Sequence, residues 1–486
     1  MNYAINAMNQ GRDGRKLTIS PWKFVLILIG VSVYFIFGQF FFPLWILPLP
    51  PIAIFIGIYL IKRESVSLSI FILTVTLIQL KSEHSGFSIF DALAGMVVVG
   101  ILAFLFVKKI FFANKYSLES NEYNLFFLSL IWIIVIGISN LIFSDTKFES
   151  WFRDSLVFSP LIVIPWMFLS LDLNKRRDSL LVYGVMLLIW IICIFVSIVN
   201  LRSSLLVSTY LFEITYHGAN LISGPFMIFV FFHLLISEEK KKKKYFLFLG
   251  LLISIASMLL VKNRTIWILT ITGICLTPFF LQKQYRKNSY KVFALLFIIF
   301  IFAITILYFR FPFFRIFLKF FISYLQSSSN LRTDPSLVGR YIEWRYAWEA
   351  IRQSPLVGYG VGSTYHTYNW FLGYFINAGY THNGYLGTLL KGGIIGFILL
   401  FLAYIGFIRK GIVLLRIQLL GQKERAFIRA GITILLLLLI ATTTFNMFAH
   451  RDVLLYVGLI WGYFLYIERT KVRNLQSTTT KTSVGK

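Results

Sequence analysis

The sequence is poor in charged residues and in cysteine, and both shortages exclude classes of protein. Only 14% of its 486 residues are charged, whereas a soluble domain carries roughly 25%. The two cysteines, Cys193 and Cys275, lie inside apolar runs, so neither a disulfide nor a cysteine-bound metal is expected. Hydrophobic residues make up 58% of the chain and recur along nearly its whole length, which leaves no room for a separate soluble domain. The chain is therefore expected to be an integral membrane protein.

Signature motifs of several chemistries are also missing. The sequence contains no glycine loop ending in Lys-Ser/Thr, no HExxH and no serine-hydrolase elbow. No two of its six histidines lie at metal-ligand spacing. ATP-driven transport and nucleotide-sugar chemistry are poorly supported, and we expect neither a metal nor a cofactor.

Acidic residues are scarce beside basic ones. The chain has 20 Asp and Glu against 47 Lys and Arg, a net charge of +27. Such a balance can indicate a nucleic-acid partner, but in a membrane protein basic residues collect in cytoplasmic loops and set the orientation. Most of the Lys and Arg residues here, including the run Glu238–Lys244, fall on one side of the expected spans. We therefore expect both termini in the cytoplasm and no nucleic-acid partner.

Apolar runs near the length of about 20 residues needed to cross the hydrocarbon core predict an all-α, polytopic membrane protein. The candidate spans lie at 23–41, 43–61, 66–80, 89–107, 123–143, 155–171, 180–200, 218–236, 245–261, 264–281, 291–309, 383–408, 427–446 and 452–467. The second contains several prolines, and the third and sixth are short. The expected number of transmembrane helices is therefore 12–14.

The spans are interrupted by one long external loop at residues 310–381. This loop separates an N-terminal transmembrane bundle at 1–309 from C-terminal transmembrane helices at 382–467, and a polar cytoplasmic tail follows at 468–486. Apolar and aromatic residues at helical spacing predict a helix near 337–353 within the loop. Its Trp and Tyr residues are typical of a helix that lies at the membrane interface.

Ionisable groups gather where the chain re-enters the membrane after this loop. The stretch YTHNGYLGTLLKGGIIGF places His382 and Asn383 at the start of a span, and Lys391 about 13 Å further along the helix. Ionisable groups at that depth usually face a cavity. A helix N-terminus attracts anions and favours the neutral imidazole, the form that can accept a proton. The alternative for His382 is a structural role as a capping or hydrogen-bonding residue.

Two arginines, Arg264 at the outer end of a span and Arg340 in the external helix, complete this set of cations. Guanidinium groups bind phosphate oxygens in a bidentate manner, although an arginine at a span's end also often snorkels to the interface. Together the cations predict an anionic lipid head group as substrate, such as a pyrophosphate presented from the outer leaflet.

Three motifs occur in order over residues 255–400: KNRTIWIL, GRYIEWRYAWEAIRQSPLVGYGVG and HNGYLGTLLKGGIIG. This pattern resembles the O-antigen ligase and polymerase superfamily of bacterial membrane glycosyltransferases. Upstream, HGANLISG, which contains Asn220, loosely resembles a family segment in which an asparagine enters a span. The sequence departs from the family pattern at Asn263, where serine is common.

The resemblance implies a GT-C-like fold and an inverting, metal-independent transfer on the outer face of the bacterial cytoplasmic membrane. The donor would be a glycan on undecaprenyl pyrophosphate, and the acceptor a sugar hydroxyl of a glycan or lipid core. Arg264 and Arg340 would bind the pyrophosphate, and His382 would activate the acceptor. The candidate substrate-binding residues are Arg264, Arg340, Lys391, Asn383, Tyr341 and Asn220. Lys391 is included on its depth and charge and not through the resemblance.

Two other functions are compatible with a membrane protein of this kind. A flippase or carrier of lipid-linked glycans would place ionisable residues near the bilayer midplane on broken helices, whereas here they cluster at the outer end. A scaffold would not explain a long cationic outer loop. Ligase and polymerase use the same donor and differ in the acceptor, so both stay open.

Overall fold

The computed structural model describes most of the chain from residue 120 to residue 472. The continuous described segments are 120–143, 146–171, 182–195, 223–259, 264–281, 283–310, 335–370 and 372–472, with isolated positions at 65–101 and 312–322. All belong to the larger of two compact units, Arg63–Lys486. The spans expected at 23–41, 43–61, 66–80 and 89–107 lie outside these continuous segments.

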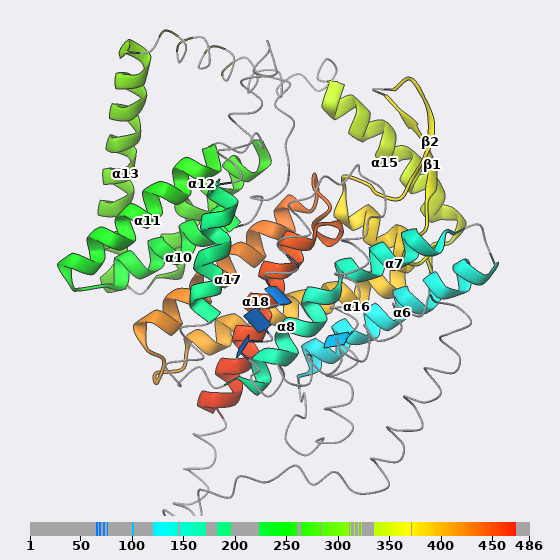
Figure 1. Cartoon of the computed structure of the whole chain (residues 1–486), viewed down its shortest axis with the longest axis horizontal. Helices are drawn as coiled ribbons and strands as arrows, with labels where there is room; N and C mark the ends of the chain where they lie inside the picture. Colours follow the sequence, from blue (N-terminus) through cyan, green and yellow to red (C-terminus); the bar gives the residue numbers. More distant parts are fainter. Residues whose placement is uncertain are drawn as a thin grey trace, which may run out of the picture. The chain divides into compact units, whose positions relative to one another are not determined.

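Helices make up nearly all of this part of the chain (Figure 1). In chain order they are α6 (Asn121–Phe143), α7 (Phe148–Val157), α8 (Ser159–Ser170), α10 (Ser223–Ser237), α11 (Lys241–Leu259), α12 (Arg264–Phe280), α13 (Lys283–Arg310), α15 (Pro335–Gln353), α16 (Gly384–Leu415), α17 (Gln422–Ala441), η3 (Met447–Ala449), α18 (Arg451–Ile467) and η4 (Glu468–Val472). A hairpin of β1 (Tyr365–Asn369) and β2 (Tyr374–Ala378) lies between α15 and α16. The all-α class is confirmed, and the hairpin is a small addition that the sequence analysis did not predict.

Four helical stretches are long and apolar enough to cross a membrane within the described residues. They are Asn121–Phe143, Phe148–Leu169, Tyr285–Arg310 and Gly384–Leu415, and shorter apolar helices occur at Val182–Phe195, Gly224–Ser237 and Ile266–Phe279. The chain is thus a polytopic membrane protein. The total of 12–14 spans stays a prediction, because several of them fall outside the described segments.

Three helix bounds differ from the expected positions. The span placed at 155–171 instead belongs to a stretch that starts at Phe148 and is divided at Phe158, whose N–H bonds Ser155 O at 3.2 Å just before a proline. The span placed at 427–446 corresponds to α17, which starts at Gln422 and ends at Ala441. The tail placed at 468–486 begins with η4, which continues α18 to Val472. The observed boundaries are set by hydrogen bonds at turns and helix ends. Hydropathy, from which the spans were predicted, contains no information on these bonds.

The C-terminal helix α18 forms the centre of the bundle. Every side chain from Val453 to Ile467 is buried. The ring of Trp461, which is 0% exposed, stacks on Phe407 of α16 with centroids 4.2 Å apart. α8 packs so closely that a Cβ atom at Gly458 would lie 2.7 Å from Pro160 O. A helix buried on all sides carries no lipid-facing stripe, and it fixes α8 and α16 against each other.

The long helix α16 is broken near its first third. Gly393 has φ 59° and ψ −167°, a conformation that L side chains rarely adopt. The turn 355–361 lies against this break, and its backbone bonds the peptide groups that the break frees. The bonds join Tyr359 N to Leu390 O (2.8 Å), Gly360 N to Lys391 O (2.7 Å) and Ile394 N to Pro355 O (2.8 Å). The break is therefore satisfied by the protein itself, as backbone at membrane depth must be.

Candidate active site

Helix α15 and the hairpin form a small layer over the start of α16 (Figure 1). The predicted helix near 337–353 is confirmed as Pro335–Gln353. Ala347 and Ile351, one helical turn apart, are 0% and 4% exposed and pack with Tyr365 of β1 and Leu390 of α16. This apolar contact fixes which face of α15 is turned toward α16.

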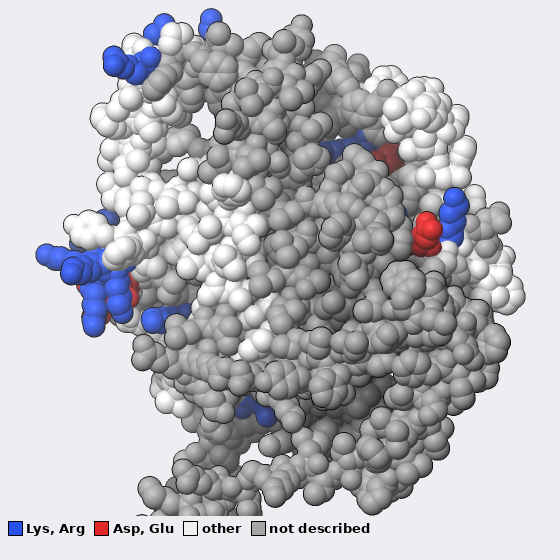
Figure 2. Space-filling model, viewed as in Figure 1, with Lys and Arg blue, Asp and Glu red and all other residues white. Residues whose placement is uncertain are grey.

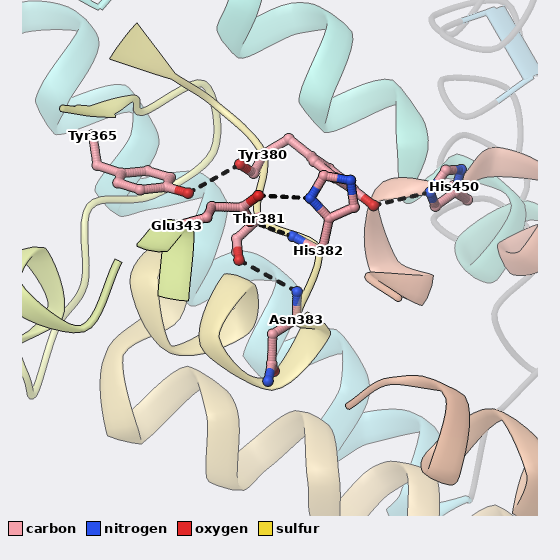
Figure 3. A network of polar contacts seen from close by, with 7 residues as sticks. All are labelled: Glu343, Tyr365, Tyr380, Thr381, His382, Asn383 and His450. Carbon is pink, nitrogen blue, oxygen red and sulfur yellow. Dashed lines mark hydrogen bonds and ion pairs between the residues drawn. The ribbon is translucent and has the colours of Figure 1, made fainter. Parts of the chain in front are cut away.

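The central feature of the site is a pair formed by His382 and Glu343 (Figure 3). The Nδ1 atom of His382 lies 2.6 Å from Glu343 Oε2, and the backbone N–H of His382 donates to Glu343 Oε1 at 2.5 Å. The carboxylate thus holds both the ring and the main chain of the histidine. When Nδ1 donates to Glu343, Nε2 is the ring nitrogen with a free lone pair. Since the His382 side chain is 46% exposed, a ligand can reach it.

Asn383, and not His382, caps α16. Its Oδ1 accepts from the backbone N–H groups of Tyr385 (3.0 Å) and Leu386 (3.1 Å), as expected of an N-cap. Thr381 Oγ1 in turn accepts from Asn383 N at 3.3 Å. The capping alternative for His382 is therefore wrong. The oxygen of Asn383 is occupied by the cap, and its role toward substrate stays a prediction.

Three aromatic residues surround the pair. The hydroxyl of Tyr365 donates to Tyr380 O at 3.2 Å, and burial, with a smaller effect of Glu343, raises the pKa of Tyr365 so that it remains protonated. The ring of Tyr380 packs edge-on against that of His382 with centroids 5.0 Å apart. Its hydroxyl reaches toward His450, whose Nε2 lies 3.4 Å away (Figure 3). The imidazole of His382 is thus held from two sides.

Arg340 lies on the same side of α15 as Glu343, one turn earlier and roughly 5 Å along the axis. It is half-buried, and it forms no hydrogen bond or ion pair with the described residues. Tyr341 is 69% exposed, and helical geometry places it about 200° around the axis from Glu343. The structure therefore places Arg340 on the face of α15 that carries Glu343, and Tyr341 on another face.

Lys391 is ion-paired with Asp154 of α7. The two side chains are 17% and 18% exposed, and Asp154 Oδ2 also accepts from Gly362 N at 3.2 Å. The structure gives Lys391 a carboxylate partner on another helix. The cavity expected at this depth and the role of Lys391 as a substrate ligand stay predictions.

Two remaining candidates cannot be placed beside the pair. Arg264 begins α12, as the sequence analysis predicted, but its side chain lies outside the description. Asn220 lies outside the described residues altogether. Their roles stay predictions.

The sequence analysis missed Glu343, His450 and Asp154. For Glu343 a signal was available, because it follows Arg340 by three residues in GRYIEW and so shares its helix face. His450 and Asp154 carry no comparable local signal, since they reach the site through α18 and α7.

An imidazole oriented by a carboxylate, beside a guanidinium on the next helical turn, is suited to deprotonate a hydroxyl and to bind an anion. These groups lie at the start of α16 in a polytopic helical fold. Residues 249–401 match the family model described as O-antigen ligase. The match confirms the resemblance to the O-antigen ligase and polymerase superfamily, and with it a glycosyltransferase type of function. No curated protein matches the chain significantly.

Proposed function

We propose that the protein transfers a glycan from undecaprenyl pyrophosphate to a sugar hydroxyl, as an O-antigen ligase or polymerase, on the outer face of the bacterial cytoplasmic membrane. The observation that carries this is the His382–Glu343 pair, with Arg340 one turn away on α15. The family match over residues 249–401 includes all three residues and supports the proposal.

In the reaction we propose, the acceptor oxygen attacks the anomeric carbon of the donor sugar. Its proton passes to Nε2 of His382, while the bond from the anomeric carbon to the pyrophosphate oxygen breaks with inversion. Glu343 keeps the imidazole oriented and stabilises the positive charge that forms on it. Arg340 and Arg264 hold the departing pyrophosphate, whose charge grows as the bond breaks. The arginines supply the positive charge that a metal supplies in other transferases, so the reaction is proposed to be metal-independent.

A carrier or flippase remains the alternative, and the broken helix α16 is a feature that carriers share. Carriers use the free peptide groups at such breaks to bind substrate or ions. Here the turn 355–361 bonds those groups, and Asp154 pairs with the lysine beside them. This arrangement favours the transferase.

The proposal predicts that Arg340→Ala and Arg264→Ala each lower glycan transfer by about a hundredfold or more, because a bidentate phosphate contact is lost. Transfer would be measured with purified protein in nanodiscs and an undecaprenyl-pyrophosphate-linked glycan, with and without EDTA. Arg352→Ala is the matched control, since Arg352 is exposed on the same helix. Wild-type rates in both variants would refute the pyrophosphate contact, and complete loss of transfer in EDTA would refute metal independence.

A further inference from the structure

An arginine without a counter-ion is buried in the bundle, far from the histidine pair. Arg429 of α17 is 3% exposed, and its Nε is enclosed without a hydrogen-bond partner. It forms no ion pair with any residue that the structure describes. Twelve residues, about 18 Å along α17, separate it from Ala441, the end of the helix near the start of α16. Because enclosing an unpaired guanidinium is costly, an anion is the ligand that this environment would stabilise.

A second unsatisfied side chain is buried in a helix that packs against α17. His233 of α10 is 0% exposed, and both of its ring nitrogens lack a hydrogen-bond partner. α10 packs along α17. The ring of Tyr285 of α13 lies 6.0 Å from the guanidinium carbon of Arg429. Two neighbouring helices therefore each bury a side chain with unsatisfied nitrogen atoms, and an aromatic ring covers one of them.

The nearby surface is rich in lysine. Lys240 and the residues that follow it, between α10 and α11, gather into a basic patch (Figure 2). Glu238 accepts from the backbone N–H groups of Glu239 and Lys240, at 3.2 Å each. Such a patch attracts anionic lipid head groups, and their phosphates carry the negative charge that could pair with Arg429.

We propose that Arg429 and His233 form a binding site for a phosphate group, carried by an anionic lipid of the leaflet that this basic patch contacts. The planar guanidinium matches two phosphate oxygens, and the imidazole N–H donates to a third. Tyr285 covers one face of the guanidinium. The proposal does not depend on the transfer reaction, and it assigns α10, α13 and α17 a ligand of their own.

Purified wild type, Arg429→Met and Arg429→Lys would be titrated with phosphatidylglycerol, phosphatidylcholine or inorganic phosphate. Binding would be followed by native mass spectrometry and by the melting temperature. Phosphatidylglycerol should bind and stabilise wild type, with an affinity at least tenfold lower in Arg429→Met. Arg429→Lys keeps the positive charge and loses the two-pronged guanidinium. Its affinity for phosphatidylglycerol should lie between those of wild type and Arg429→Met. Arg416→Gln, an exposed arginine after α16, is the control and should bind as wild type does.

Each other outcome would overturn part or all of the proposal. Equal stabilisation of wild type by inorganic phosphate, lost in Arg429→Met, would replace the lipid by a soluble anion. Equal binding of phosphatidylglycerol to wild type and Arg429→Met would remove the site. An Arg429→Met protein that is more stable than wild type under all conditions would show that the arginine is simply unpaired.

Discussion

Glu343 acts on His382 through two atoms at once, and this makes it the most informative single residue of the site. One carboxylate oxygen accepts from the ring and the other from the backbone N–H. The first contact selects the tautomer, and the second fixes where the chain enters α16. A glutamine has one acceptor oxygen, so it can satisfy only one of these two donors.

Glu343→Gln is therefore expected to lower the turnover number about tenfold or more while the donor KM changes little. The substitution removes the group that orients the imidazole, and it leaves in place the arginines that are proposed to bind the phosphates. Steady-state transfer kinetics would separate the two parameters. Glu349→Gln is the control on the same helix, where Glu349 forms an exposed ion pair with Arg345. A donor KM that rises as much as the turnover number falls would assign Glu343 a purely structural role.

His382→Gln keeps a hydrogen-bonding group and removes the base. Turnover should fall by roughly 10²–10⁴-fold while lipid donor binding persists, because the arginines provide the phosphate contacts. Donor binding and transfer would be measured on the same preparation. Near wild-type transfer by the Gln variant would show that the base lies elsewhere or that the reaction needs none.

At the scale of single elements, the break in α16 depends on one glycine. A Cβ atom at Gly393 would lie 2.2 Å from Leu356 O, and the backbone conformation itself is strained for other residues. Gly393→Ala should therefore destabilise the protein by about 1–3 kcal/mol or more and loosen the turn 355–361. Melting curves would measure this, with Gly184→Ala as the control, since nothing lies within 4 Å of a Cβ atom there. Equal melting temperatures would mean that the break tolerates a side chain.

The Lys391–Asp154 pair joins this broken helix to α7, and a double substitution separates its two possible roles. Lys391→Met alone leaves Asp154 with Arg153, at 3.9 Å, as its cationic partner. Breaking a fully buried ion pair costs about 3–5 kcal/mol, and the cost here should be smaller. Lys391→Met with Asp154→Asn removes both charges and should recover part of the stability. If transfer recovers as well, the pair is structural. If stability recovers and transfer does not, Lys391 contacts the substrate.

At the scale of the whole molecule, the distribution of basic residues predicts which side of the membrane each end of the bundle faces. In a cysteine-free background, Leu372→Cys in the hairpin turn should react with a membrane-impermeant thiol reagent on intact cells or spheroplasts. Lys243→Cys, in the basic patch, should react only after lysis. Both positions are exposed on the surface of the protein. A difference in labelling between them would therefore report the side of the membrane and not burial. The reverse pattern would place the histidine pair in the cytoplasm and remove the lipid-linked donor from its reach.

Sequence alone determined the features that depend on local composition. Long apolar runs predicted the membrane helices, since crossing a bilayer requires length and hydropathy and no partner. Helical spacing placed the helix near 337–353, which the structure confirms as α15. The three motifs, in their order along the chain, indicated the family.

Tertiary structure alone decided which residues meet. Glu343 and His382 are 39 residues apart, and Lys391 and Asp154 are 237 apart. No local pattern encodes such pairs, because each partner is placed by the packing of its own helix. The same is true of Asn383: its type suits either a cap or a ligand, and only the position of the helix start made it the cap. Hydropathy predicts that a charged residue in a membrane segment needs a partner, and the fold determines which residue that partner is.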